Sequence, residues 1–219
     1  MALVDGVGSW AWVADPVIHH ERKPALFIDR DGVLVQEVHF LRCPEDVVLL
    51  AHAAETIAAF NRAGIPVIVV TNQSGIARGI LSWGEFERVE AEIRRQLSCV
   101  AGAHLDAVFA CGYHDAGLGA LGVRDHAWRK PNPGMLLEAA ARLDVRLDAS
   151  WIVGDRAHDL ATGRAAGLAG GIHVMTGHGD AHERRSALAL AQADFQVMPA
   201  DDLADAIQLR DPMIGQAKC

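Results

Sequence analysis

Residues 27–33 read FIDRDGV, an apolar run that ends in an Asp-Arg-Asp-Gly turn. The chain is continuously apolar over 25–28, which is typical of a strand buried on both faces of a sheet. Two carboxylates, Asp29 and Asp31, follow at once. The stretch predicts a buried strand whose carboxyl end carries acidic side chains.

The rest of the chain repeats this alternation of short strands and helices. Further strands are expected over 65–70, 105–111, 151–153, 171–175 and 195–197, and helices over 52–62, 82–97, 134–143, 157–166, 183–191 and 200–207. Apolar strands that alternate with helices form parallel sheets covered on both faces. The pattern predicts an α/β fold with a three-layer, doubly wound, Rossmann-like parallel sheet.

The length of 219 residues suits one domain. We expect that domain to span 24–210, after an irregular N-terminal extension over 1–23 and before a frayed C-terminal tail over 211–219. Residues 112–128 form a Gly-rich stretch without periodicity. Because that is long for a loop in a compact domain, we expect it to have a function in specificity.

The composition disfavours several classes of protein. There are 20 Lys and Arg against 28 Asp and Glu, and this net charge of −8 argues against nonspecific nucleic-acid binding. No apolar run approaches the roughly 20 residues that span a bilayer, and the opening residues lack the basic start of a secretory signal. The four cysteines show no disulfide-like spacing. We expect a reduced, cytoplasmic protein with no membrane or nucleic-acid partner, as a monomer or small homo-oligomer.

Polar residues also follow other predicted strands or precede the next helix. They are Thr71-Asn72, Arg129-Lys130 and Gly154-Asp155, with Asp159 four residues after Asp155. Singly, each has an ordinary explanation as a helix cap, a turn or a solvated face. Together they favour a ligand site, because ligands of open parallel sheets bind at the carboxyl ends of the strands.

The chemistry of such a site follows from its residue types. Clustered carboxylates repel one another and need a cation, and oxygen ligands favour Mg²⁺. A lysine and a hydroxyl-rich turn suit a phosphate group. One carboxylate could attack that phosphate, and a second in the same turn could transfer protons. No P-loop motif is present.

These residues carry a family resemblance over about 24–179. The set Asp29-x-Asp31, Thr71-Asn72, Lys130 and Gly154-Asp155 resembles the four motifs of the haloacid dehalogenase (HAD) superfamily of phosphatases. The stretches FIDRDGV, VVTNQSGIARG, RKPNPGML and VGDRAHD are similar to its histidinol-phosphate and D-glycero-D-manno-heptose-1,7-bisphosphate phosphatase branch.

The resemblance implies a role for each matching position. Asp29 would be the nucleophile and Asp31 the general acid/base, while Asp29, the Asp31 carbonyl and Asp155 would bind Mg²⁺. The phosphoryl group would be held by Thr71 and Asn72 and neutralised by Lys130; Arg129 would contact substrate and Asp159 would support the site.

The segment lengths indicate a protein without a cap domain. Superfamily members often insert a cap after the first motif or before the lysine. The 40 residues from Asp31 to Thr71 are filled by a flap at about 33–48, one helix and a strand, and the 19 residues from Cys111 to Lys130 suffice only for a loop.

The resemblance also raises the question of zinc, because the branch usually has a Cys/His zinc loop in this place. Here Cys111, His114 and His126 are at most three ligand candidates, with Asp115 or Asp125 as a fourth. Since a structural zinc site needs four ligands, we expect instead a loop held by packing of Trp128, Leu118 and Leu121.

The sequence thus predicts a Mg²⁺-dependent phosphomonoesterase that acts through an aspartyl-phosphate on a small phosphorylated metabolite. A sugar (bis)phosphate such as D-glycero-D-manno-heptose 1,7-bisphosphate is the first choice, and histidinol phosphate or another small metabolite is the alternative. A polynucleotide 3′-phosphatase is disfavoured by the acidity. A non-catalytic binding protein on the same fold would be indicated by loss of Asp29 or Asp31, and both are present.

Overall fold

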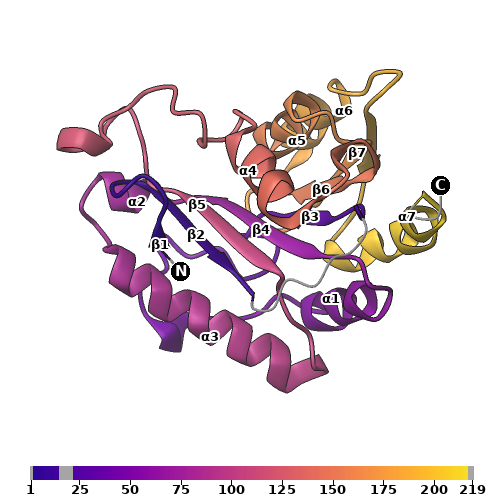
Figure 1. The fold of residues 1–219 in the computed structure, drawn as a ribbon, viewed down its shortest axis with the longest axis horizontal. Coiled ribbons are helices and arrows are strands. Elements are labelled where there is room, and N and C mark those ends of the chain that lie inside the picture. The colour runs from indigo at the N-terminus through magenta and orange to yellow at the C-terminus, as the bar shows by residue number, and fades with distance from the viewer. Residues whose placement is uncertain (1, 15–21, 217–219) are drawn as a thin grey trace.

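The computed structural model describes residues 2–14 and 22–216, which build one sheet of eight strands with helices on both faces (Figure 1). The strands are β1 (Ala2–Leu3), β2 (Ser9–Val13), β3 (Leu26–Ile28), β4 (Val67–Asn72), β5 (Ala107–Cys111), β6 (Trp151–Gly154), β7 (Gly170–His173) and β8 (Gln196–Pro199). The α-helices are α1 (Ala53–Arg62), α2 (Ser74–Ala77), α3 (Trp83–Ala101), α4 (Gly134–Leu143), α5 (Ala157–Ala165), α6 (Ala181–Leu188) and α7 (Arg210–Gln216). Short 3-10 helices cover Pro44–Asp46, Gly119–Leu121, Leu147–Ala149 and Leu203–Leu209.

The strand order is β1-β2-β5-β4-β3-β6-β7-β8. The six strands from β5 to β8 pair in parallel, which confirms the predicted doubly wound α/β sheet. The chain winds outward from β3 to β5 and then returns to place β6 on the other side of β3. Such a reversal opens a crevice at the carboxyl ends of the central strands, where ligands of this architecture bind.

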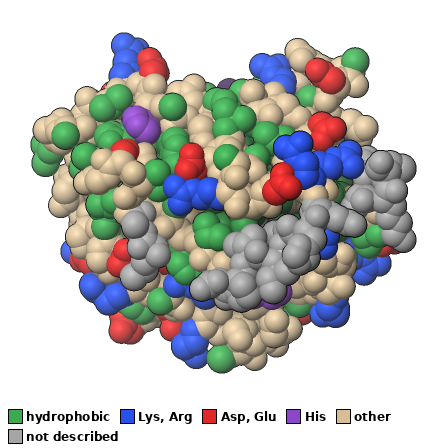
Figure 2. Space-filling model, in the orientation of Figure 1, with side chains coloured by type: hydrophobic (Ala, Val, Ile, Leu, Met, Phe, Trp, Pro, Cys, Tyr) green, Lys and Arg blue, Asp and Glu red, His purple; other side chains and the backbone are tan. Residues whose placement is uncertain are grey.

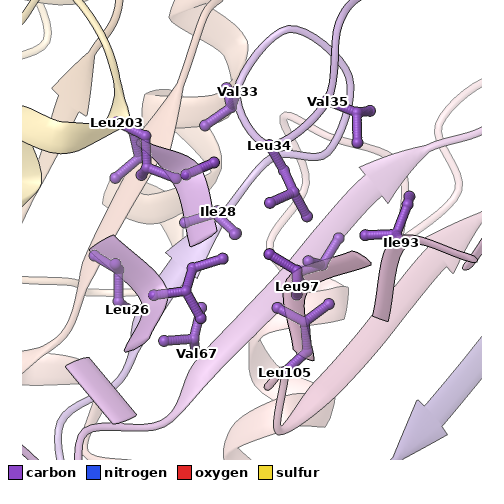
Figure 3. Close-up of a cluster of buried hydrophobic side chains, with 14 of the residues drawn as sticks. Leu26, Ile28, Val33, Leu34, Val35, Val67, Ile93, Leu97, Leu105 and Leu203 are labelled. Carbon is purple, nitrogen blue, oxygen red and sulfur yellow. The ribbon is translucent and has the colours of Figure 1, made fainter. Parts of the chain in front are cut away.

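Two hydrophobic clusters fill the spaces between the sheet and its helices. Alternate residues of the central strands point to opposite faces, as the strand period of two requires. Leu26, Ile28 and Val67 belong to the cluster under α1 and α3 (Figure 3), whereas Phe27 and Ile68 belong to the one under α4, α5 and α6. All five are fully buried, so the central strands are apolar on both faces.

Helix α3 begins as the sequence predicts. Ser82 accepts a hydrogen bond from the Glu85 backbone N–H, and the Glu85 side chain accepts one from the Ser82 N–H, which completes a capping box. The helix ends at Ala101 and is capped by Gly102, whose φ of 63° is a left-handed conformation that glycine adopts without a Cβ penalty.

The N-terminal residues differ from the prediction of an irregular extension. Strands β1 and β2 form an antiparallel pair, and β2 pairs antiparallel with β5 from Ser9↔Cys111 to Val13↔Ala107. The alternation of Trp10 and Trp12 was a weak signal for a strand, because Gly6 and Gly8 come just before it. Residues 15–21 of the predicted extension lie outside the described residues. The domain boundaries at 24 and 210 stay a prediction.

The C-terminal end also differs from the prediction of a frayed tail. Helix α7 spans Arg210–Gln216, and its Met213 is buried in the cluster that contains α1. Residues 200–207 were expected as a helix, and most of them lie in the 3-10 helix Leu203–Leu209. Residues 217–219 lie outside the described residues.

No cap domain interrupts the described part of the core. Only the 3-10 helix Pro44–Asp46 and α1 lie between β3 and β4, and only the 3-10 helix Gly119–Leu121 lies between β5 and α4. None of the described helices is long and apolar enough to cross a membrane. Basic and acidic side chains are interspersed over the described part of the face in Figure 2, without a broad basic patch.

Candidate active site

A pocket of about 360 Å³ opens where β3, β4 and β6 end. Its wall contains every phosphatase-motif residue predicted from the sequence except Asp159, which lies directly behind it: Asp29, Asp31, Thr71, Asn72, Arg129, Lys130 and Asp155. The parallel register explains this convergence. Ile28 lies beside Val69 on one side and Val153 on the other, so Asp29 follows level with Gly154, the last residue of β6, and with Val70, shortly before β4 ends at Asn72.

A buried lysine lies between two of the carboxylates. Lys130 Nζ is 2.8 Å from Asp29 Oδ1 and 2.6 Å from Asp159 Oδ1, and it donates a third hydrogen bond to the Val70 carbonyl. The side chains of Lys130 and Asp159 are 1% and 0% exposed. Such a pair, shielded from water, fixes the ammonium group at the base of the pocket.

Local hydrogen bonds hold Asp159 and the backbone of Lys130 in place. Asp159 lies in the first turn of α5, where its Oδ2 accepts a hydrogen bond from the Arg156 backbone N–H. Asn72, at the end of β4, exchanges two hydrogen bonds with the Lys130 backbone, at 3.1 and 3.2 Å. Asn72 therefore holds the segment that carries the lysine, and its predicted contact with a phosphoryl group stays a prediction.

The carboxylates of Asp29, Asp155 and Asp159 form the one cluster with metal-ligand spacing among the described residues, with an oxygen of each within 4.8 Å of the others. Burial raises the pKa of Asp29 well above its ordinary value, Lys130 lowers it, and Asp159 and Asp155 raise it. Burial and then Asp159 raise the pKa of Asp155 to about 7. Burial also opposes ionisation of Asp159, but Lys130 lowers the pKa of that carboxyl.

These charges fit a divalent cation. Lys130 neutralises part of the cluster, and the raised pKa of Asp155 reflects its burial first and the neighbouring Asp159 carboxylate second. Hard oxygen ligands at this spacing suit Mg²⁺. Two glycines leave room beside Asp155, because a Cβ on Gly32 or Gly177 would lie 2.4 or 2.3 Å from Asp155 Oδ2.

Asp31 is held by a second set of contacts. Arg30 donates to both of its carboxylate oxygens at 2.8 Å, and Gln73 Nε2 donates to Asp31 Oδ2 and to Thr71 Oγ1. Arg30 is 1% exposed and is paired on its other side with Glu90 of α3, at 3.1 Å. The acid/base candidate is thus fixed by a buried chain of charges.

A family model described as HAD-hydrolase-like matches residues 127–206. The D-glycero-beta-D-manno-heptose-1,7-bisphosphate 7-phosphatase of Mesorhizobium japonicum is 49% identical over 148 residues, which cover 68% of each chain. The D-glycero-D-manno-heptose-1,7-bisphosphate 7-phosphatase of Thermosynechococcus vestitus is 40% identical over 190 residues, 85% of this chain and 94% of its own. The chain belongs to the HAD-like phosphatases.

Solved structures agree with this membership. A HAD-like phosphatase from Mesorhizobium loti has a TM-score of 0.86 at 39% identity and covers 96% of this chain and 97% of its own. The D,D-heptose 1,7-bisphosphate phosphatase from B. bronchiseptica, complexed with magnesium and phosphate, has a TM-score of 0.70 at 31% identity and covers 84% and 96%. The predicted resemblance to this family is confirmed.

Several residues of the phosphatase site were not predicted from the sequence. Arg30 stands inside the first motif but looked like a turn residue. Glu90 had a detectable signal, because it falls on the apolar stripe of α3 formed by Phe86, Val89, Ile93 and Leu97. His178, whose backbone N–H donates to Asp155 Oδ2 at 2.7 Å, had none, because it lies in a loop after β7.

The loop over 112–128 does not bring the three zinc candidates together as one ligand set among the described residues. Cys111 is fully buried in β5, His114 pairs with Asp115, and His126 stacks on Tyr113 at 3.9 Å between ring centroids. The aromatic ring of Tyr113 thus lies against His126, one of the candidate ligands, and the expectation of a loop without zinc stays a prediction.

The predicted apolar packing of this loop is partly right. Trp128 is buried and packs edge-on against Phe109, at 5.8 Å, and Leu121 is partly buried against both clusters. Leu118 is 67% exposed, so its predicted packing role is wrong. The 3-10 turn at Gly119–Leu121 points this side chain outward while Leu121 turns inward.

Proposed function

We propose that this phosphatase hydrolyses a sugar bisphosphate with Mg²⁺ as cofactor, and that its substrate is D-glycero-D-manno-heptose 1,7-bisphosphate. The observation that carries the proposal is the buried Lys130 between Asp29 and Asp159, with Asp155 beside them in one pocket. The relatives named above act on this heptose at its 7-phosphate, which supports the same substrate here.

Asp29 is the nucleophile in this proposal. Its Oδ1 is engaged by Lys130 Nζ and by the Arg30 backbone N–H, at 2.8 Å each, and this fixes the carboxylate plane. Oδ2 would attack the phosphorus atom, the bond from phosphorus to the sugar oxygen would break, and an aspartyl-phosphate would form. Lys130 would stabilise charge on the phosphoryl oxygens from a fixed position.

Asp31 carries the protons. It would donate one to the leaving sugar oxygen and then remove one from the water that attacks the aspartyl-phosphate. That second step releases inorganic phosphate and restores Asp29. Arg30 and Gln73 hold the Asp31 carboxyl group through both steps, and Thr71 would donate to the phosphoryl group.

The metal ligands would be Asp29, Asp155 and the backbone carbonyl of Asp31, with Asp159 in support. Bound Mg²⁺ would offset the negative charge of the carboxylates and of the phosphoryl oxygens, so that the two can approach. Arg129 would contact the part of the substrate beyond the transferred phosphate. We also propose that the protein works in the cytoplasm.

The test compares substrates on the purified protein. We expect phosphate release from the 7-position of heptose 1,7-bisphosphate, seen by ³¹P NMR, which stops on chelation of Mg²⁺. Its kcat/KM should exceed that for histidinol phosphate by about 100-fold, because a second phosphate gives the site an additional charged contact. Equal values, or turnover of histidinol phosphate alone, would contradict the heptose proposal.

A further inference from the structure

The turn that joins β1 to β2 is ordered by one carboxylate. Asp5 Oδ1 accepts hydrogen bonds from the backbone N–H groups of Val7, Gly8 and Ser9, at 2.9, 3.0 and 3.1 Å. Three donors on one oxygen fix the side chain, and the hydrogen bonds from Ser9 and its neighbours lower the pKa of Asp5 although burial opposes this. Asp5 Oδ2 stays available for a contact outside the turn.

That contact is with Tyr113, the second residue after β5. The Tyr113 hydroxyl donates to Asp5 Oδ2 at 2.9 Å, and Tyr113 as a residue is 7% exposed. One face of the ring lies near His126, and Gly8 lies so close that a Cβ there would be 2.7 Å from a ring carbon. The Gly112 N–H also donates to the Gly8 carbonyl. The turn therefore clamps the start of the loop over 112–128.

Arg129 lies at the other end of this loop and is tied to its start. Its Nη1 donates to the Tyr113 carbonyl at 3.0 Å, and its side chain forms part of the pocket wall. Arg129 makes no ion pair within 4 Å among residues 2–14 and 22–216. A half-buried guanidinium without a carboxylate partner suits an anionic ligand group.

The hairpin is itself anchored to α3. The indole of Trp10 donates to Glu87 Oε1 at 2.9 Å and packs edge-on against Phe86. The indole of Trp83 donates to the Val7 carbonyl at 3.2 Å. The turn that holds Asp5 is thus connected to the core on one side and to the loop on the other.

We propose that the N-terminal hairpin, residues 2–13, is a positioning element of the active site. Asp5 fixes Tyr113, Tyr113 fixes the Arg129 guanidinium, and Arg129 binds the phosphate that is not transferred. This rests on the proposed function, in which the substrate has two phosphates. Asp5 and Tyr113 are positioning residues and touch no reacting atom.

The kinetic test uses two substrates and three variants. Asp5→Ala should raise KM for heptose 1,7-bisphosphate about tenfold with kcat nearly unchanged, because a displaced arginine weakens binding of the second phosphate. Tyr113→Phe keeps the ring and should raise KM about threefold. Neither should change kcat/KM for p-nitrophenyl phosphate, which has no second phosphate. Asp202→Ala, which removes a similar side-chain bond to the Ala204 N–H, is the control and should change neither.

A double-mutant cycle separates positioning from general loosening of the fold. In an Arg129→Ala background, Asp5→Ala should change kcat/KM for the bisphosphate by less than about twofold, because the group it positions is gone. A further tenfold loss in that background, or unchanged KM in the single variant, would overturn the proposal.

A second measurement needs no sugar substrate. Arg124 is exposed in the loop, so trypsin cleavage after it reports on loop opening. Asp5→Ala should speed this cleavage about tenfold and Asp202→Ala should not; an unchanged rate would overturn the clamp. If the wild type cleaves p-nitrophenyl phosphate but no sugar bisphosphate, the substrate proposal fails, and the trypsin rates still decide whether the hairpin holds the loop.

Discussion

Replacement of Glu90 by alanine tests the buried chain of charges behind the active site. Glu90 Oε1 lies 3.1 Å from Arg30 Nη1, and both side chains are 1% exposed. Burial raises the pKa of Glu90, while Arg30 acts in the opposite direction. In the Glu90→Ala variant the Arg30 guanidinium would keep Asp31 as its charged partner and would lose the other.

The expected loss of stability is about 4 kcal/mol. Removal of one partner of a buried ion pair costs about 3–5 kcal/mol, because the remaining charge is left desolvated. Because Arg30 keeps its contact with Asp31, the electrostatic part of this loss should be about 3 kcal/mol. The lost packing of the Glu90 side chain adds about 1 kcal/mol. For a chain of this size, 1 kcal/mol corresponds to about 2–4 °C in Tm, so Tm should fall by about 8–16 °C.

Thermal unfolding followed by circular dichroism measures this difference. Glu90→Gln keeps an acceptor for Arg30 and should lose about half as much stability. Glu92→Ala on the same helix removes a pair with Arg95, whose side chain is 62% exposed, and should leave Tm nearly unchanged, because pairs open to water gain little. A fall of less than about 3 °C for Glu90→Ala would refute the argument that this pair supports the site.

Three further results are expected. The pKa of about 7 at Asp155 means that the folded, metal-free protein holds a proton that the unfolded chain loses near pH 4. The stability of the metal-free protein should therefore fall as pH rises from about 4 to 7. Mg²⁺ should raise Tm more at pH 8 than at pH 5.5, and equal increments would contradict this. Gly32→Ala would place a Cβ 2.4 Å from Asp155 Oδ2 at a φ of 80°, so calorimetry should find Mg²⁺ binding weakened at least tenfold; unchanged affinity would count against Asp155 as a ligand. Lys130→Met should lower kcat at least about 1000-fold, and a loss below tenfold would remove Lys130 from the mechanism.

Most of the fold could be predicted because its central strands are short apolar runs that are easily recognised in the sequence. The run VIVVTN of β4 is apolar through Val70 and ends in polar residues, so both the strand and its functional end are visible in the sequence. Strand β2 was missed because its partner strand β5 lies far along the chain, with Ser9 beside Cys111, and because Trp10 is held by Glu87 of α3, 77 residues away. The local sequence pattern carries no information about contacts between residues so far apart in the chain.

The active site also contains residues that could be predicted from the sequence and residues that could not. The convergence of Asp29 and Asp155 could be predicted because parallel strands bring their carboxyl ends to one edge. Lys130 lies before α4, and its place beside them was implied by the family resemblance. His178, whose backbone N–H holds Asp155, could not be predicted, because it lies in the loop after β7. Glu90 was visible as a charged residue on the apolar stripe of α3, but its partner Arg30 was not visible from that pattern. Their positions depend on how helices and loops pack around the pocket.

The central claim is phosphoryl transfer to Asp29, and the most direct measurement is acid quenching of the enzyme during turnover. Mass spectrometry of the digested protein should find one phosphoryl group on the peptide that contains Asp29, in the presence of Mg²⁺ and substrate. The Asp29→Asn variant should remain folded, carry no phosphoryl group and release no phosphate. A phosphoryl group on another residue, or normal turnover by Asp29→Asn, would contradict the mechanism.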